Sequence, residues 1–471
     1  MTPKDERRMK THQRTVLIIS AFFPPTQNIA AVRAGKMIKY LPSFGWIPIC
    51  ITCDDKGTSK QGLKEDLDSS DVYRLRASHF SEQVIYEQSR FLMRIFGTPS
   101  IKKTNIINKD DLNPSDILTR IGNSLSLFFE DPQGWSSEAI KLGIQLCNSR
   151  SIDVILSSYS PWKTHYVAWK IHKKTAIPWV AEYRDPWTFN PYMEKIWPVD
   201  KIERLYESHM LKDSTAIIGV TPSLTRELSK KLKKPAFTVF NGFDEDEFKR
   251  GFEPKGSSIF TISYTGKIHL GKRDPTPLLT AIDDLISEKI ISEEDIRIRF
   301  YGGNVEILRP FIEKSLEKCV ELIGPVSYAD SLKIQMNSTV LLLLSWNDER
   351  DAQTLTGKIF EYFGAARPIL ALAYKKGEIA RLIEDTRTGV TANSPNEIKE
   401  IIQTWLKEMK QIGQIKSYYD PDHALVCSYT RKAQCAKLAQ ILNAVSDNSN
   451  KETGISRLVD ASEMNLNFKS R

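Results

Sequence analysis

Several features that mark whole classes of protein are scarce or missing in this chain of 471 residues. No stretch reaches the run of about 18 apolar residues that a membrane-spanning helix requires. Only 6 cysteines occur, and the single Cys-x-x-Cys pair, Cys50 and Cys53, has no second pair at the spacing of a zinc site. Scattered cysteines favour reduced cytosolic thiols over a disulfide framework. No basic and aromatic motif typical of nucleic-acid binding is present.

Basic residues near the start imitate a signal peptide without completing one. Lys4, Arg7 and Arg8 precede an apolar segment at 16–23, but this segment is short, contains Ser20 and ends at two prolines. We therefore predict a first β-strand here and not a cleaved leader.

The composition is that of an ordinary globular protein, with 41% hydrophobic and 26% charged residues. The length gives room for two domains of Rossmann size and a tail. The net charge of +8 suits anionic partners such as nucleotide sugars, lipid phosphates or an acidic membrane leaflet.

The most informative stretch is 340–372. Residues 340–346 have the pattern of a buried parallel strand, and a polar loop leads to a predicted helix at 357–363 with Thr356 as its N-cap. Gly364 is expected to end this helix, and another strand follows. In such a β-loop-α-β unit, ligands bind beyond the carboxyl ends of the strands.

Glu361 is an isolated carboxylate within the apolar sequence of that helix. A carboxylate in such a place must be exposed, paired or used. The helix N-terminus is suited to phosphate, and an acidic side chain one turn further on can accept hydrogen bonds from a ribose diol. On this segment alone, a nucleotide-diphosphate pocket and an ordinary solvent-facing glutamate are equal alternatives.

This stretch resembles the donor site of GT-B glycosyltransferases, and most nearly their large retaining family 4. The resemblance rests on Gly357, Lys358, Glu361 and Tyr362, followed by the segment 367–370. It implies an α/β fold of two facing Rossmann-like domains with parallel sheets and an interdomain cleft.

The same resemblance assigns Glu361 to the ribose of a nucleotide sugar, and Thr356, Gly357 and Lys358 to donor binding. Many members of the family carry a further acidic residue, eight positions earlier, that touches the sugar. Gln353 occupies that position here.

A basic turn opens the predicted second domain. A strand at 260–264 leads to Gly266 and Lys267, with Lys272 and Arg273 close behind. Glycine lets the backbone approach a ligand, and the cations can neutralise a pyrophosphate. In the family, basic residues of this turn bind the donor phosphates; Lys267 and Arg273 match best, with Lys272 a rival for the second role. The alternative is a solvated basic loop.

Two more strand ends complete the predicted donor set. Gly302 follows a strand at 296–301. Pro325 and Val326 follow a strand at 320–323, in a loop that contacts the base in the family.

Polar clusters in the first half of the chain also follow predicted strands. His165 comes after the strand at 153–158, and Arg184 and Asp185 come after the strand at 178–182. Their order resembles a bacterial polysaccharide-type subgroup of the family. The resemblance implies that Arg184 and Asp185 bind or orient an acceptor hydroxyl, and that His165 faces the acceptor or caps its helix. A structural Arg–Asp pair is the alternative.

The first loop departs from the family pattern. Residues 26–31 stand where a Gly-Gly pair is usual. Arg33, in the amphipathic helix that follows, is interpreted as a surface charge.

We predict an N-terminal acceptor domain at 14–244 with a helical insertion near 80–130, and a donor domain at 259–415. A helix at 416–445 is expected to return to the first domain, and 446–471 to form a disordered tail. The insertion mixes basic, aromatic and aliphatic residues, so it either packs as extra helices or lies on a membrane surface.

The predicted activity is transfer of a sugar from a nucleoside-diphosphate sugar to a hydroxyl of a carbohydrate or lipid-linked acceptor, in cell-surface polysaccharide or glycolipid synthesis. We expect no metal and no other cofactor, and a cytoplasmic protein, peripheral on the inner face of the cell membrane if the insertion binds lipid. Two alternatives are a non-catalytic nucleotide-sugar-binding scaffold and a GT-B nucleotide-sugar epimerase.

Overall fold

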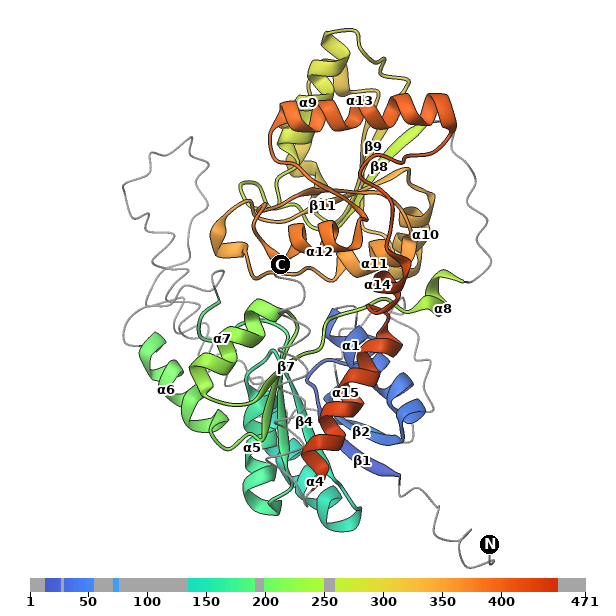
Figure 1. Cartoon of the computed structure of the whole chain (residues 1–471). Helices are drawn as coiled ribbons and strands as arrows, with labels where there is room; N and C mark the ends of the chain where they lie inside the picture. Colours follow the sequence, from blue (N-terminus) through green and yellow to red (C-terminus); the bar gives the residue numbers. More distant parts are fainter. Residues whose placement is uncertain are drawn as a thin grey trace, which may run out of the picture. The chain divides into compact units, whose positions relative to one another are not determined.

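The computed structural model describes residues 13–26, 29–54, 71–75, 134–190, 199–249 and 259–447. These residues form two compact units, the first within 1–239 and 435–471 and the second spanning 240–434. Each unit is built on one parallel β-sheet with helices packed on both faces (Figure 1).

The first unit has a 7-stranded sheet in the order β3-β2-β1-β4-β5-β6-β7. Its strands are β1 (Arg14–Ile19), β2 (Trp46–Cys53), β3 (Val72–Leu75), β4 (Val154–Tyr159), β5 (Trp179–Tyr183), β6 (Ala216–Gly219) and β7 (Ala236–Thr238). Its helices are α1 (Ile29–Tyr40), α4 (Trp135–Ser149), α5 (Lys163–Thr175), α6 (Val199–Leu211), α7 (Pro222–Leu232) and most of α15 (Arg431–Ser446).

Strand β1 shows why the first sheet is buried on both sides. Leu17 and Ile19 join a core that includes residues of α4 and α5, whereas Val16 and Ile18 join a core that includes residues of α1 and α15. Successive side chains of a strand point to opposite faces, so a continuous apolar run is what a doubly covered parallel strand requires.

The second unit has a 6-stranded sheet in the order β10-β9-β8-β11-β12-β13. Its strands are β8 (Phe260–Thr265), β9 (Ile296–Tyr301), β10 (Val320–Ile323), β11 (Val340–Leu344), β12 (Ile369–Leu372) and β13 (Gly389–Thr391). Its helices are α8 (Glu245–Phe248), α9 (Thr276–Ser287), α10 (Tyr328–Asn337), α11 (Lys358–Ala365), α12 (Glu378–Thr386), α13 (Pro395–Ile412) and α14 (His423–Cys427).

Strand β11 is an inner strand of this sheet and, like β1, is buried on both faces. Leu342 and Leu344 face the core formed with α9 and α13, while Leu341 and Leu343 face the core formed with α11 and α12. The two pairs of helices lie on opposite faces of the sheet in Figure 1.

Helix α11 differs from the prediction at both ends. It begins at Lys358 with Gly357 as its N-cap, although the Thr356 hydroxyl still accepts a hydrogen bond from the Lys358 N–H at 3.4 Å. Gly364 does not end the helix, and Ala366 is its C-cap. A Cβ at Gly364 would lie 2.3 Å from the ring of Phe248, so this glycine serves close packing of α8 and not helix termination.

The predicted insertion near 80–130 and the predicted tail beyond 447 lie outside the described residues. Within the described ranges, no helix is both long and apolar enough to cross a membrane.

Candidate functional site

The residues predicted to bind the donor lie at the carboxyl edge of the second sheet. Gly266 follows β8, Gly302 follows β9, Pro325 and Val326 follow β10, and α11 follows β11. Because β10, β9, β8 and β11 are consecutive neighbours, these loops lie along one edge. The strand order reverses between β8 and β11, which is where an open parallel sheet forms a crevice for ligands.

Gly266 and Gly302 allow two of these loops to touch. A Cβ at Gly302 would lie 2.2 Å from the carbonyl oxygen of Gly266, and the Gly266 N–H donates to the Tyr301 carbonyl at 2.7 Å. A Cβ at Gly266 would in turn lie 2.7 Å from Cε of Lys358. Glycine at 266 therefore lets the side chain of Lys358 reach the basic turn.

The cations of the basic turn gather around one imidazole. Burial lowers the pKa of His269, and the charges of Arg273, Lys267 and Lys272 lower it further. Lys267 is exposed, while Lys272 and Arg273 are half-buried. The turn is thus a concentration of positive charge beside the crevice, as a diphosphate site requires.

Two of these cations have distinct neighbours. Nζ of Lys272 lies 4.6 Å from the centroid of the Trp346 ring, a cation–π contact. Arg273 is near Lys358 instead: burial lowers the pKa of Lys358, the charge of Arg273 adds to this effect, and the carboxylate of Glu361 opposes it. The structure thus brings Arg273, Lys358 and Glu361 together.

Glu361 is half-buried in the first turn of α11. Its Oε2 accepts a hydrogen bond from Nε2 of Gln335 at 3.0 Å, and no described residue donates one to Oε1. Burial raises the pKa of Glu361, while the charge of Lys358 and the hydrogen bond from Gln335 act in the opposite direction. One anchored oxygen and one open oxygen suit a ribose hydroxyl.

Sequence reasoning missed the other residues around Glu361. These are Gln335 and Tyr328 of α10 and Glu247 of α8. The Tyr328 hydroxyl donates to Oε2 of Glu247 at 3.1 Å. Burial raises the pKa of Tyr328, and the carboxylates of Glu361 and Glu247 raise it further. No motif marks these residues, because their helices approach α11 only in the folded chain.

The loop after β11 contains the position where the family has its second acid. Gln353 is half-buried there. The nearby acid Asp351 is 4% exposed and accepts hydrogen bonds from the Ser345 hydroxyl at 2.5 Å and the Trp346 N–H at 3.0 Å. Asp351 therefore fixes the loop and does not replace the missing acid.

A buried charge network lies near the carboxyl end of β5 in the first unit. Arg33 is 3% exposed, so its interpretation as a surface charge is wrong. Its Nε and Nη2 donate to Oε1 of Glu182 at 3.0 and 2.7 Å, and the Ser158 hydroxyl donates to Oε2 at 2.7 Å. Burial alone would raise the pKa of Glu182, but Arg33 holds it below its ordinary value. A buried carboxylate needs such a counter-charge.

Arg184 and Asp185 follow the same strand. The guanidinium of Arg184 is half-buried, and its Nη2 donates to the Ser160 carbonyl at 2.7 Å. Its Nε has no hydrogen-bond partner among the described residues. Asp185 is exposed. Burial lowers the pKa of Arg184, and the charge of Asp185 opposes this effect.

His165 is fully buried near the start of α5, whose N-cap is Trp162. Its Nδ1 lies 2.7 Å from the Ser157 hydroxyl, which accepts a hydrogen bond from Nε1 of Trp179 at 2.8 Å. The other ring nitrogen, Nε2, is buried and has no hydrogen-bond partner among the described residues. Burial and the charge of Arg184 lower the pKa of His165 to about 3, which keeps it neutral.

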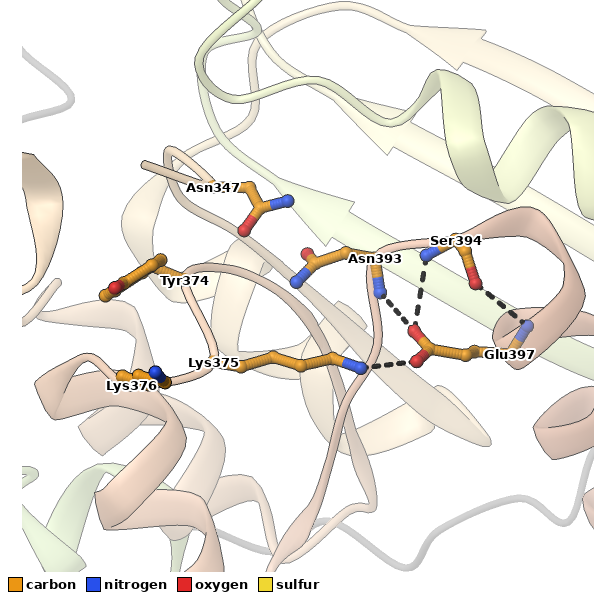
Figure 2. Close-up of a pocket in the computed structure, with 7 residues that line it drawn as sticks. All are labelled: Asn347, Tyr374, Lys375, Lys376, Asn393, Ser394 and Glu397. Atoms are coloured by element: carbon orange, nitrogen blue, oxygen red, sulfur yellow. Dashed lines mark hydrogen bonds and ion pairs between the residues drawn. The ribbon is translucent and has the colours of Figure 1, made fainter. Parts of the chain in front are cut away.

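A pocket of about 480 Å³ lies beyond the ends of β11, β12 and β13, and none of its lining residues is among those predicted from sequence. It is lined by Asn347, Tyr374, Lys375, Lys376, Asn393, Ser394 and Glu397. Figure 2 shows Lys375 and the N–H groups of Asn393 and Ser394 converging on the carboxylate of Glu397. Ser394 and Glu397 form the capping box of α13, and Lys375 and the Asn393 N–H bind the same carboxylate, so most of the pocket's polar groups are committed to structure.

No cluster of histidine, cysteine, aspartate or glutamate that could hold a metal ion occurs in the described part of the chain. The predicted absence of a metal requirement stays a prediction.

Comparison with known proteins identifies the fold. No family model matches the sequence, and no curated protein matches it. The structure is similar to a glycosyltransferase from Rickettsia africae, with 14% identity, a TM-score of 0.56, and coverage of 93% of this chain and 100% of that one. It is similar to a sucrose-phosphate synthase from Thermosynechococcus elongatus, with 12% identity, a TM-score of 0.51 and coverage of 95% and 99%.

A putative UDP-N-acetylglucosamine 2-epimerase from Listeria monocytogenes is also similar, with 13% identity, a TM-score of 0.50 and coverage of 93% and 98%. With the two parallel sheets of 7 and 6 strands, these similarities show that the chain has the α/β GT-B fold, as predicted.

Proposed function

We propose that this protein is a glycosyltransferase that moves a sugar from a nucleoside-diphosphate sugar to a hydroxyl acceptor. The observation that carries the proposal is the meeting of Glu361, Lys358 and Arg273 at the switch point of the second sheet. A carboxylate with one open oxygen suits a ribose, and neighbouring cations suit a diphosphate. The similarity in fold to a glycosyltransferase supports the same proposal.

The basic turn would act on the leaving group. As the bond from the sugar to the diphosphate breaks, negative charge grows on the diphosphate, and Lys267, Arg273 and Lys358 stabilise that charge. Gly266 lets the side chain of Lys358 approach the basic turn, and Gly302 lets the loops after β8 and β9 touch. The exposed Pro325 and Val326 would meet the base.

Acceptor binding is assigned to the first unit. Asp185 is exposed, so its carboxylate can meet a hydroxyl group, whereas Arg184 is half-buried and its unpartnered Nε is itself buried. His165 is buried and neutral, which suits a supporting role beneath Arg184 and not proton transfer. The motif resemblance to retaining family 4 supports retention of configuration and an acceptor of cell-surface polysaccharide or glycolipid synthesis.

Nucleotide binding tests the proposal directly. Wild type and Glu361→Ala are titrated with UDP, GDP and dTDP in a calorimeter, with Glu384→Ala, an exposed glutamate of α12, as the matched control. Glu361→Ala should lose about 1.5–3 kcal/mol of binding free energy, the usual contribution of a charged hydrogen bond. A folded Glu361→Ala variant that binds like wild type would contradict the ribose assignment.

Product analysis then separates the functions. Incubation with mixed nucleotide sugars and hydroxyl acceptors should yield a glycosylated acceptor together with free nucleoside diphosphate. An altered nucleotide sugar formed without acceptor would identify an epimerase. Binding without any turnover would identify a scaffold.

A further inference from the structure

Gln335 is a buried amide that connects a strand end to Glu361. Its side chain is 0% exposed within α10. Nε2 donates to the hydroxyl of Thr265, the last residue of β8, at 3.2 Å, and to Oε2 of Glu361 at 3.0 Å. Both hydrogens of the amide are thus used on two residues that border the candidate site.

The same amide is unsatisfied on its other side. Oε1 of Gln335 is buried and has no hydrogen-bond partner within the described ranges. A buried acceptor without a partner destabilises the fold, so an apolar side chain would fill this position better if packing were its only role. What the amide does provide is a fixed donor directed at one oxygen of Glu361.

We infer that Gln335 is a positioning residue that holds Glu361 in its nucleotide-binding orientation through the Nε2–Oε2 hydrogen bond. The inference rests on the proposed nucleotide site. With Oε2 fixed by Gln335, Oε1 stays free for the ribose. A neutral donor achieves this without adding a charge: a lysine would neutralise the carboxylate, and a glutamate would repel it.

Gln335 also acts on the protonation of Glu361. The charged or titratable groups that face Glu361 are Lys358 and Tyr362 of its own helix, Tyr328 of α10, Glu247 of α8 and Arg431. Burial and Glu247 favour the protonated carboxyl, whereas Lys358, Arg431 and the Gln335 hydrogen bond favour the carboxylate. Removal of the amide therefore raises the pKa of Glu361, and acidification should neutralise it at a higher pH.

The test compares Gln335→Met with a matched control on the same helix. Methionine keeps an unbranched side chain of similar size and removes the donor. The control is Ser338→Ala at the C-cap of α10, because the Ser338 hydroxyl donates a buried hydrogen bond to Ser263 of β8 at 2.8 Å without touching Glu361. Dissociation constants for UDP, GDP and dTDP are measured between about pH 4.5 and pH 8, a range in which a glutamate whose pKa is raised, as that of Glu361 is, titrates. Thermal unfolding is followed in parallel.

We expect roughly tenfold weaker nucleotide binding in Gln335→Met, the loss of one hydrogen bond to a charged group, without loss of thermal stability. Its affinity should also begin to fall at a higher pH than that of wild type. Ser338→Ala should lose thermal stability and keep the wild-type affinity and pH profile.

The outcomes separate this inference from the proposed function. If Glu361→Ala weakens binding and Gln335→Met matches wild type in affinity and pH profile, the role of Gln335 is refuted and the ribose assignment stands. If Glu361→Ala binds like wild type, both fail. If Gln335→Met does not fold, Gln335→Glu keeps the size and replaces the donor with a second carboxylate; wild-type affinity in that variant near neutral pH refutes the inference.

Discussion

Lys358 and Gly266 meet at the carboxyl edge of the second sheet, where an added Cβ on Gly266 would lie 2.7 Å from Cε of Lys358. The contact joins the basic turn after β8 to the first turn of α11. Neither residue type is unusual alone. Because Gly266 has no side chain, the ammonium group of Lys358 can lie beside the basic turn at the crevice.

Gly266→Ala should therefore impair nucleotide binding. The new methyl group would displace Lys358 and press on the Tyr264 hydroxyl, which would be 2.9 Å away. Overpacking of this kind costs about 1–3 kcal/mol, and we expect a loss of roughly tenfold in nucleotide affinity by calorimetry. Gly303→Ala is the control, since a Cβ there meets nothing within 4 Å. Equal affinities in the two variants would exclude a role for this contact.

The cations of the turn should matter most in the transition state. Lys267→Ala and Arg273→Ala should lower kcat more than they raise KM, because the leaving diphosphate gains charge as the sugar departs. Steady-state kinetics with the donor identified by product analysis measures both constants. Lys289→Ala removes an exposed cation elsewhere in the same unit and should leave both unchanged. Wild-type turnover in both turn variants would refute the phosphate assignment.

The sequence was sufficient to predict the two parallel sheets, and it drew attention to Glu361, whose role in binding stays a prediction. Continuous apolar runs such as 340–344 can be buried only on two faces, and the structure buries β11 on both. Glu361 is conspicuous because a carboxylate interrupts an apolar helix, and this signal is local. The prediction that Gly364 ends the helix was wrong. The glycine is required by the ring of Phe248, and the position of that ring cannot be predicted from the local sequence.

The remaining errors and omissions concern partners distant in sequence. Arg33 has the spacing of a surface residue in an amphipathic helix. No residue close to it in the sequence indicates that its guanidinium pairs with the carboxylate of Glu182 in the fold. Gln335 is an unremarkable polar residue until α10 packs against α11. Whether a polar side chain is buried depends on such partners, and the local periodicity of the sequence does not predict them.

The Arg33–Glu182 pair yields a stability prediction. Arg33→Met leaves the buried Glu182 carboxylate without its counter-charge and should cost about 3–5 kcal/mol of unfolding free energy, measured with urea. The double variant Arg33→Met/Glu182→Gln should recover much of this loss. A single variant as stable as wild type would show that the pair is dispensable.

The pH dependence of that loss has a definite sign. In wild type the pKa of Glu182 is below its ordinary value, so the pair's contribution is present above the unfolded-state pKa and disappears as pH falls through the folded-state value. In Arg33→Met, the buried carboxyl prefers to be protonated. The difference in unfolding free energy between variant and wild type should therefore begin to narrow at a pH above about 4.3, the ordinary glutamate value, as the variant's carboxyl takes up its proton, and should narrow further below it as wild type loses its ion pair. A difference in unfolding free energy that does not change with pH would show that Arg33 stabilises the fold through packing and not through its charge.

The last prediction concerns the basic and aromatic segment at 80–129, which lies outside the described residues. We predict that it attaches the protein to an anionic membrane surface beside a lipid-linked acceptor. Four cations there, Arg90, Arg94, Lys102 and Lys103, would each contribute on the order of 1 kcal/mol near such a surface. Binding should weaken steeply above physiological salt, because the Debye length falls below about 8 Å.

Sedimentation with phosphatidylserine-containing liposomes at low and high salt measures this attachment. A variant with glutamine at all four positions should stay in the supernatant at low salt. The matched control loses the same charge from four exposed lysines elsewhere, Lys174, Lys289, Lys376 and Lys407, and should sediment like wild type. If wild type stays in the supernatant at low salt, or if both variants sediment alike, the segment at 80–129 is not a membrane anchor, and extra packed helices become the better interpretation.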